Sequence, residues 1–206
     1  MAILLALGAG AAAVPADDPL GEAAAAIDRG DGISAEVAAR RALDAGASRS
    51  EVAAFVGEAE LLQGDFSDAR EWLGPGDFSL SSRERGYHAL GRLEMEDDNL
   101  AAAASAFDKA LQLGGENARL WVDIGRLRYR GGQHHLALEA AARAVAIDPN
   151  EPRALEFKAQ LTRDAVGVRG ALPLFETALA KAPNDLGLLG EYAATLGEAG
   201  RHGAGF

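Results

Sequence analysis

Small, bulky and polar positions recur along this 206-residue chain with a period of 34 residues and without gaps. The units that start at Glu84 and Ala118 both place a bulky aromatic residue at position 4 and a glycine at position 8. The same frame divides the chain into units 16–49, 50–83, 84–117, 118–151 and 152–185, followed by a partial unit 186–206. The pattern predicts two antiparallel helices in each full unit, and therefore eleven helices after residue 16.

Three positions of the frame hold only alanine or glycine. They are position 8 (Ala23, Gly57, Gly91, Gly125, Ala159, Ala193), position 20 (Ala35, Ala69, Ala103, Ala137, Ala171) and position 27 (Ala42, Gly76, Ala110, Ala144, Ala178). Small residues let paired helices approach closely, and larger residues such as Phe107 and Phe175 at position 24 fill the remaining space. Because no unit can bury its apolar face alone, stacking of neighbouring units must supply the stability.

This pattern resembles the tetratricopeptide repeat (TPR) family, whose consensus has the same small positions, an aromatic residue at position 24 and proline at position 32. Pro149 and Pro183 occupy position 32 here. The resemblance covers residues 16–206 and implies an all-α solenoid of about five and a half helix-turn-helix repeats in a right-handed superhelix. It also implies a protein–protein interaction module that needs no cofactor.

Three departures from the consensus predict local irregularities. Gly74-Pro75-Gly76 should end the second helix of the second unit after Leu73. Pro173 lies inside the second helix of the fifth unit, which should therefore start late or kink. The sixth unit should have a first helix from Leu186 to Ala199 and a glycine-rich tail, so its apolar edge could also pair with another copy of the chain.

The composition narrows the function. A net charge of −11 argues against a nucleic-acid or anionic-membrane binder, and the absence of cysteine removes disulfides, thiolate metal sites and cysteine nucleophiles. No apolar run is long enough for a membrane span.

Residues 1–16 form an apolar stretch that ends in a small-residue site before Asp17, which is typical of a secretory signal although no basic residue precedes Arg29. The alternative is an alanine-rich helix packed on the repeats. A cleaved signal would place the protein in the periplasm or outside the cell, whereas its absence would leave the protein in the cytoplasm.

No residue pattern indicates catalysis or metal binding. His134 and His135 are adjacent, so on a helix their side chains point apart and make a poor metal pair. The acidic residues around Asp97 lack the spacing of a calcium loop. Gly86–Gly91 is not a phosphate loop, because no strand precedes it, and no nucleophile-elbow motif is present. The chain is therefore not expected to be an enzyme or to hold a metal or cofactor.

The first helices of TPR units line the concave groove through positions 2, 5, 9, 12 and 13, which follow one helical face. The candidate residues of the peptide groove are Arg85, His88, Arg92, Arg119, Arg126, Tyr129, Arg130, Arg153 and Gln160. Arginines suit carboxylates, and interleaved apolar groups suit a peptide, so the expected ligand is an acidic segment of a partner protein. The alternative is a solvated face in which these arginines pair with Glu84, Asp123 and Glu156.

Three functions remain open. The first is a non-enzymatic interaction module of the bacterial cell envelope that binds a partner segment in its groove. The second is an accessory TPR region of a longer enzyme or membrane-assembly protein. The third is a scaffold organised through its convex faces without a groove ligand. The sequence does not identify the partner.

Overall fold

The structure, a computed structural model of the chain, describes residues 18–203, and within that range it contains eleven α-helices and no strand. The helices are α1 (Pro19–Asp28), α2 (Gly32–Asp44), α3 (Arg49–Gln63), α4 (Phe66–Leu73), α5 (Arg83–Glu96), α6 (Leu100–Gly114), α7 (Ala118–Arg130), α8 (His134–Ile147), α9 (Pro152–Val166), α10 (Val168–Lys181) and α11 (Leu186–Gly203). This confirms the predicted number of helices and the all-α fold class. The predicted signal segment lies outside the described residues.

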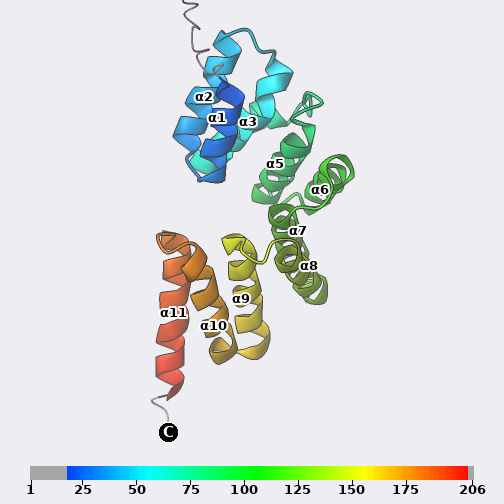
Figure 1. The fold of residues 1–206 in the computed structure, drawn as a ribbon. Coiled ribbons are helices and arrows are strands. Elements are labelled where there is room, and N and C mark those ends of the chain that lie inside the picture. Colours follow the sequence, from blue (N-terminus) through cyan, green and yellow to red (C-terminus); the bar gives the residue numbers. More distant parts are fainter. Residues whose placement is uncertain (1–17, 204–206) are drawn as a thin grey trace, which may run out of the picture.

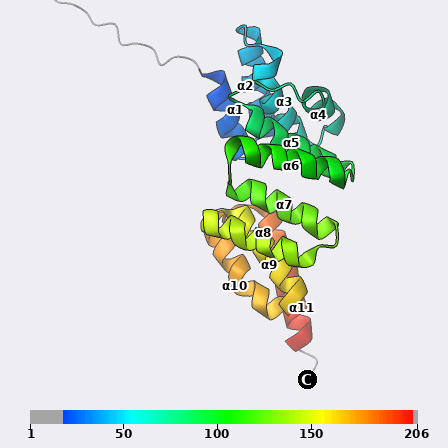
Figure 2. The ribbon, with the colours of Figure 1, turned by 90° about the vertical axis from the view of Figure 1, so that its right-hand side faces the viewer.

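The helices form antiparallel pairs that stack into a curved array (Figures 1 and 2), with α1 and α2 at one end and α11 at the other. Each odd-numbered helix from α1 to α9 packs closely against the even-numbered helix that follows it. The odd-numbered helices also contact one another in succession, from α1 to α3, α5, α7 and α9. They therefore form one continuous row, which is the row expected to carry the groove.

In each full repeat, the second helix starts at the same position of the 34-residue frame. These helices begin at Gly32, Phe66, Leu100, His134 and Val168, and each start lies 34 residues after the previous one. Helix α4 ends at Leu73 as predicted, and the segment 74–82 crosses to α5 without helical structure.

Phe78 replaces the missing last turn of α4. Its side chain is buried with Leu73 and Leu93, and its ring packs edge-on against Tyr87 at a centroid distance of 5.3 Å. A β-carbon on Gly86 would lie 2.5 Å from the Phe78 ring, so only glycine allows α5 to approach this loop so closely.

Two predictions of helix boundaries are wrong. The sequence predicted that α10 would start late or kink at Pro173. The late start is wrong, since α10 begins at Val168 in register with the other second helices and contains Pro173. Proline lacks an N–H, so this position gives up one backbone hydrogen bond near the start of the helix, a cost that packing of Phe175 in the core can offset. Helix α11 does not end at Ala199 but continues to Gly203.

Small and aromatic side chains interlock between the paired helices. A β-carbon on Gly91 would lie 2.3 Å from the ring of Phe107, which occupies position 24 of the same repeat. In the next repeat position 24 is Ala141, and the space over Gly125 is filled by Phe157 from the following repeat, 2.4 Å from the position of a β-carbon. The small residues at position 8 therefore allow the close helix contacts that the sequence predicted.

Among the described helices, none has the length and apolar character that a bilayer crossing requires.

Candidate functional site

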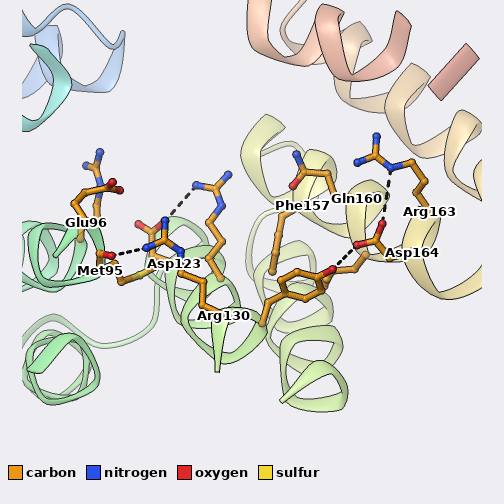
Figure 3. Close-up of a pocket in the computed structure, with 12 residues that line it drawn as sticks. Met95, Glu96, Asp123, Arg130, Phe157, Gln160, Arg163 and Asp164 are labelled. Carbon is orange, nitrogen blue, oxygen red and sulfur yellow. Dashed lines mark hydrogen bonds and ion pairs between the residues drawn. The ribbon is translucent and has the colours of Figure 1, made fainter. Parts of the chain in front are cut away.

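Positions 9, 12 and 13 of three successive first helices converge on a cavity of about 510 Å³ (Figure 3). We call it the central cavity. Its lining residues are Arg92, Met95 and Glu96 from α5, Asp123, Arg126, Tyr129 and Arg130 from α7, and Phe157, Gln160, Leu161, Arg163 and Asp164 from α9. Five of the nine predicted groove residues line this cavity: Arg92, Arg126, Tyr129, Arg130 and Gln160.

The other predicted residues are placed differently. Arg85, His88 and Arg119 line a second cavity of about 430 Å³ near the amino-terminal ends of α5 and α7. Six carboxylate residues share that cavity: Asp28, Glu58, Glu84, Glu116, Asp148 and Glu151. Arg153 is not among the residues that line either cavity. The nine residues therefore do not form one uniform basic strip.

Carboxylates of neighbouring repeats neutralise several of the predicted arginines. Arg85 and Arg92 both donate to Glu58 of α3, at 2.9 and 3.2 Å. Arg126 lies 3.5 Å from Asp123 on its own helix. Of the three carboxylates that the sequence offered as partners, only Asp123 pairs with a groove arginine. The contribution of Glu58 was missed, because it depends on which repeats face each other in space.

Glu84 and Glu156 accept hydrogen bonds from amides instead. The Asn117 side chain donates to Glu84 at 3.0 Å, and the Gln160 side chain donates to Glu156 at 3.3 Å. These two carboxylates therefore do not pair with the arginines of the groove.

An ion pair spans the concave side of the array. Arg119 of α7 donates to Asp28, at the carboxyl end of α1, at 2.8 Å, although the two residues are 91 positions apart. The same guanidinium donates to Glu151 at 3.1 Å. The curvature of the array brings the first repeat to the fourth, a contact that a repeat-by-repeat sequence comparison does not predict. Because both Arg119 and Asp28 are more than a third exposed, this contact contributes little stability.

The floor of the central cavity is apolar. Met95, Phe157 and Leu161 are each buried, and the guanidinium of Arg126 lies 5.9 Å from the centre of the Phe157 ring. Phe157 was not predicted to belong to the groove. The sequence could have indicated this role, because Phe157 is the only aromatic residue at position 6 of the third to fifth units. The third unit has Ala89 at this position and the fourth has Asp123.

The walls of the cavity present Tyr129 and four arginines, which are Arg92, Arg126, Arg130 and Arg163. The Tyr129 hydroxyl donates to Asp164 at 2.6 Å, and its ring packs edge-on against His134. Arg130 donates to the backbone carbonyl of Met95. Val122 holds position 5 of its repeat, one of the positions expected to line the groove, but its apolar side chain is buried in the core with Ala137 and Phe157. An apolar floor between charged walls can accept a side chain of a partner protein.

Asp123 is the most strongly perturbed titratable group of the groove. Burial alone would raise its pKa, but the hydrogen bond from His88, at 2.8 Å, and the charges of His88, Arg92 and Arg126 lower the pKa to about 2. The ionised carboxylate therefore holds α5 and α7 together through His88.

This shift predicts a loss of stability in acid. The folded pKa of Asp123 lies below its usual value of 3.8, so its stabilisation is present above that pH and is lost as the pH falls toward 2. The loss amounts to about 2 kcal/mol. We expect the difference in unfolding free energy between the wild type and Asp123→Asn, measured in urea, to shrink over this pH range. A difference in unfolding free energy that does not change with pH would contradict the lowered pKa of Asp123.

Among residues 18–203, no group of three or more histidine, aspartate and glutamate side chains is arranged to hold a metal ion. His134 and His135 are both exposed at the start of α8.

Comparisons with known proteins give one consistent result. A tetratricopeptide repeat profile matches residues 94–161, which include most of the central cavity. BBSome complex member bbs-4 of Caenorhabditis elegans is 27% identical over 94 residues, which are 45% of this chain and 20% of that protein. This chain thus spans only a small part of that relative's length.

Solved structures share the fold. A thermophilic TPR protein of Thermus thermophilus superposes with a TM-score of 0.66 at 24% identity, covering 86% of this chain and 97% of that one. The first TPR domain of Spaghetti, solved with an HSP90 peptide, superposes with a TM-score of 0.50 at 14% identity, covering 57% and 93% of the two chains.

Proposed function

This chain belongs to the tetratricopeptide repeat family, and from that premise we propose that it is a non-enzymatic scaffold that binds a segment of a partner protein in its concave groove. TPR domains are interaction modules that bind proteins or peptides, and one neighbour in fold was solved with a peptide. The single observation that carries the proposal is the central cavity, where three repeats bring charged walls and an apolar floor together.

The roles of the groove residues follow from their placement. Tyr129, whose side chain is about a third exposed, and Gln160 lie where a partner side chain can contact them above Phe157. Arg126, which lies 3.5 Å from Asp123, and Arg130, which donates to the Met95 carbonyl, stand beside this position. Their remaining N–H groups can donate to carbonyl or carboxylate groups of a partner. Arg85, Arg92 and Arg119 already pair with carboxylates of the chain, so they contribute less to an acidic ligand than the sequence predicted.

We also propose that the protein acts in the bacterial cell envelope. The support for this location is the signal-like composition of residues 1–16. N-terminal sequencing of the native protein tests it: a start near Asp17 is expected, and a retained Met1 or Ala2 would exclude processing.

Site-specific photo-crosslinking tests the binding face. A photoreactive p-benzoylphenylalanine replaces Tyr129 in the central cavity, and in a matched variant it replaces Glu139, which is exposed on α8. In extracts of the native host, the Tyr129 variant is expected to capture a discrete protein that the Glu139 variant does not. Equal capture by both variants, or capture only from Glu139, would refute a groove-bound partner.

A further inference from the structure

Two exposed positions of the second helices carry large aliphatic side chains only in the first repeat. Positions 18 and 22 of the frame are exposed in all five full repeats. The four later repeats hold Ser67 and Glu71, Ala101 and Ser105, His135 and Glu139, and Arg169 and Pro173 there. The first repeat instead has Ile33 and Val37, one turn apart on α2, which are 68% and 56% exposed. Leaving two such side chains in water is unfavourable, so this surface is suited to being covered by another molecule.

Ile33 and Val37 border a cavity of about 430 Å³ between α1 and α2. We call the surface around this cavity the α1–α2 face, and its main residues are Glu22, Ala25, Arg29, Ile33, Val37 and Arg41. None of these residues lines the central cavity or the second cavity of the groove. The first repeat forms one end of the array (Figure 2), so the α1–α2 face can be covered while the central cavity stays open.

The charges of the α1–α2 face are arranged so that the face complements itself. Arg41 donates to Glu22 at 2.7 Å, which marks one end of the face. Arg29, at the carboxyl end of α1, marks the other end. Arg29 is exposed, and in the part of the chain that the structure describes it forms no ion pair. Because α1 and α2 are antiparallel, Ala25 and Val37 lie between the two ends.

A second copy of the chain fits this arrangement. A twofold axis through the middle of the face would place Arg29 of each copy beside Glu22 of the other. The same operation would bring the ridge of Ile33 and Val37 on each copy to the cavity between α1 and α2 of the other. The face thus both needs apolar side chains to fill a cavity and supplies them.

We propose that the α1–α2 face binds the same face of a second copy, which gives a twofold dimer with a free groove on each protomer. This inference goes beyond the proposed function and does not depend on it. It also places self-association at the opposite end of the array from α11, whose apolar edge the sequence suggested for pairing. Such a dimer presents two central cavities, so it can hold two segments of one partner assembly.

Cysteine crosslinking tests the position of the interface. Because the chain contains no cysteine, each variant introduces a single thiol. Val37→Cys places it in the middle of the face, and Glu139→Cys is the matched control at the same position 22, exposed on α8. Leu196→Cys tests the apolar edge of α11. With bismaleimidoethane and the full chain, we expect Val37→Cys to give linked dimers about tenfold faster than either of the others, because only its thiols meet at the twofold axis.

Charge reversal tests whether the two copies meet in this orientation. Arg29→Glu would place two carboxylates together across the interface, and Glu22→Arg would place two guanidiniums together. Each variant alone is therefore expected to dimerise about tenfold more weakly than the parent in sedimentation equilibrium. An equal mixture of the two variants should recover dimerisation, because a heterodimer again pairs opposite charges at both contacts. Circular dichroism establishes that each variant is folded.

Four results would overturn the dimer. They are a parent chain that stays monomeric, equal crosslinking from Glu139→Cys, faster crosslinking from Leu196→Cys, and a mixture of the charge variants that associates no better than each variant alone. A monomer in which the Val37→Cys thiol is protected from maleimide would mean that the chain itself covers the face, and this would also reject the proposal. Failure of the Tyr129 crosslinks would reject only the groove partner.

Discussion

Replacing Gly125 by leucine is expected to lower the free energy of unfolding by about 3 kcal/mol. A β-carbon at this position would lie 2.4 Å from Cε1 of Phe157 and 3.3 Å from Cβ of Ala140, so even the first added atom forces α7 away from its neighbours. Urea unfolding followed by circular dichroism measures the change.

The matched control is Gly190→Leu on α11, where no atom lies within 4 Å of the added β-carbon. This substitution should be neutral or slightly stabilising, because leucine favours a helix more than glycine does. In the double variant Gly125→Ala/Phe157→Leu, the opposing phenylalanine is replaced by the smaller leucine. This variant should recover part of the stability that is lost in Gly125→Ala alone. Equal unfolding midpoints for Gly125→Leu and Gly190→Leu would mean that the helix pairing is assigned incorrectly.

Removing the ring of Phe107 is expected to cost about 3 to 5 kcal/mol in Phe107→Ala. The side chain is fully buried, lies over Gly91 and packs edge-on against His88 of the groove. The cavity left behind lies between α5 and α6 and cannot collapse without moving the helix that carries Arg85 and Arg92.

Phe66→Ala provides the comparison, since this phenylalanine is 42% exposed at the start of α4. Its removal should cost less than about 1 kcal/mol. The same free-energy loss at both positions would show that position 24 does not fill the core.

Most of the fold could be predicted because a repeat has the same requirements in each copy. The small residue at position 8 and the large residue at position 24 face each other within one pair of helices, as Gly91 and Phe107 do. The early end of α4 in the second repeat could also be predicted, because Gly74-Pro75-Gly76 cannot continue a helix. The late start predicted for α10 is not observed, because packing of α10 in the core outweighs one missing backbone hydrogen bond.

The groove was predicted only in outline. Arg92, Arg126 and Tyr129, which hold position 9 or 12 of their repeats, line one cavity in the structure. Their partners depend on the curvature of the whole array, which no single repeat encodes. The pairing of Arg119 with Asp28 is an example, because it joins α7 to the first repeat. The neutralisation of Arg85 by Glu58 likewise arises only once α3 and α5 are side by side.

The central claim is that the face formed by α5, α7 and α9 binds the partner. Amide hydrogen exchange of the full chain, with and without the protein captured by crosslinking, tests it most directly. The account predicts that slowed exchange on binding concentrates in the carboxyl-terminal halves of α5, α7 and α9, around Met95, Tyr129 and Gln160. Protection confined to α6, α8 and α10, with these three helices unchanged, would contradict it.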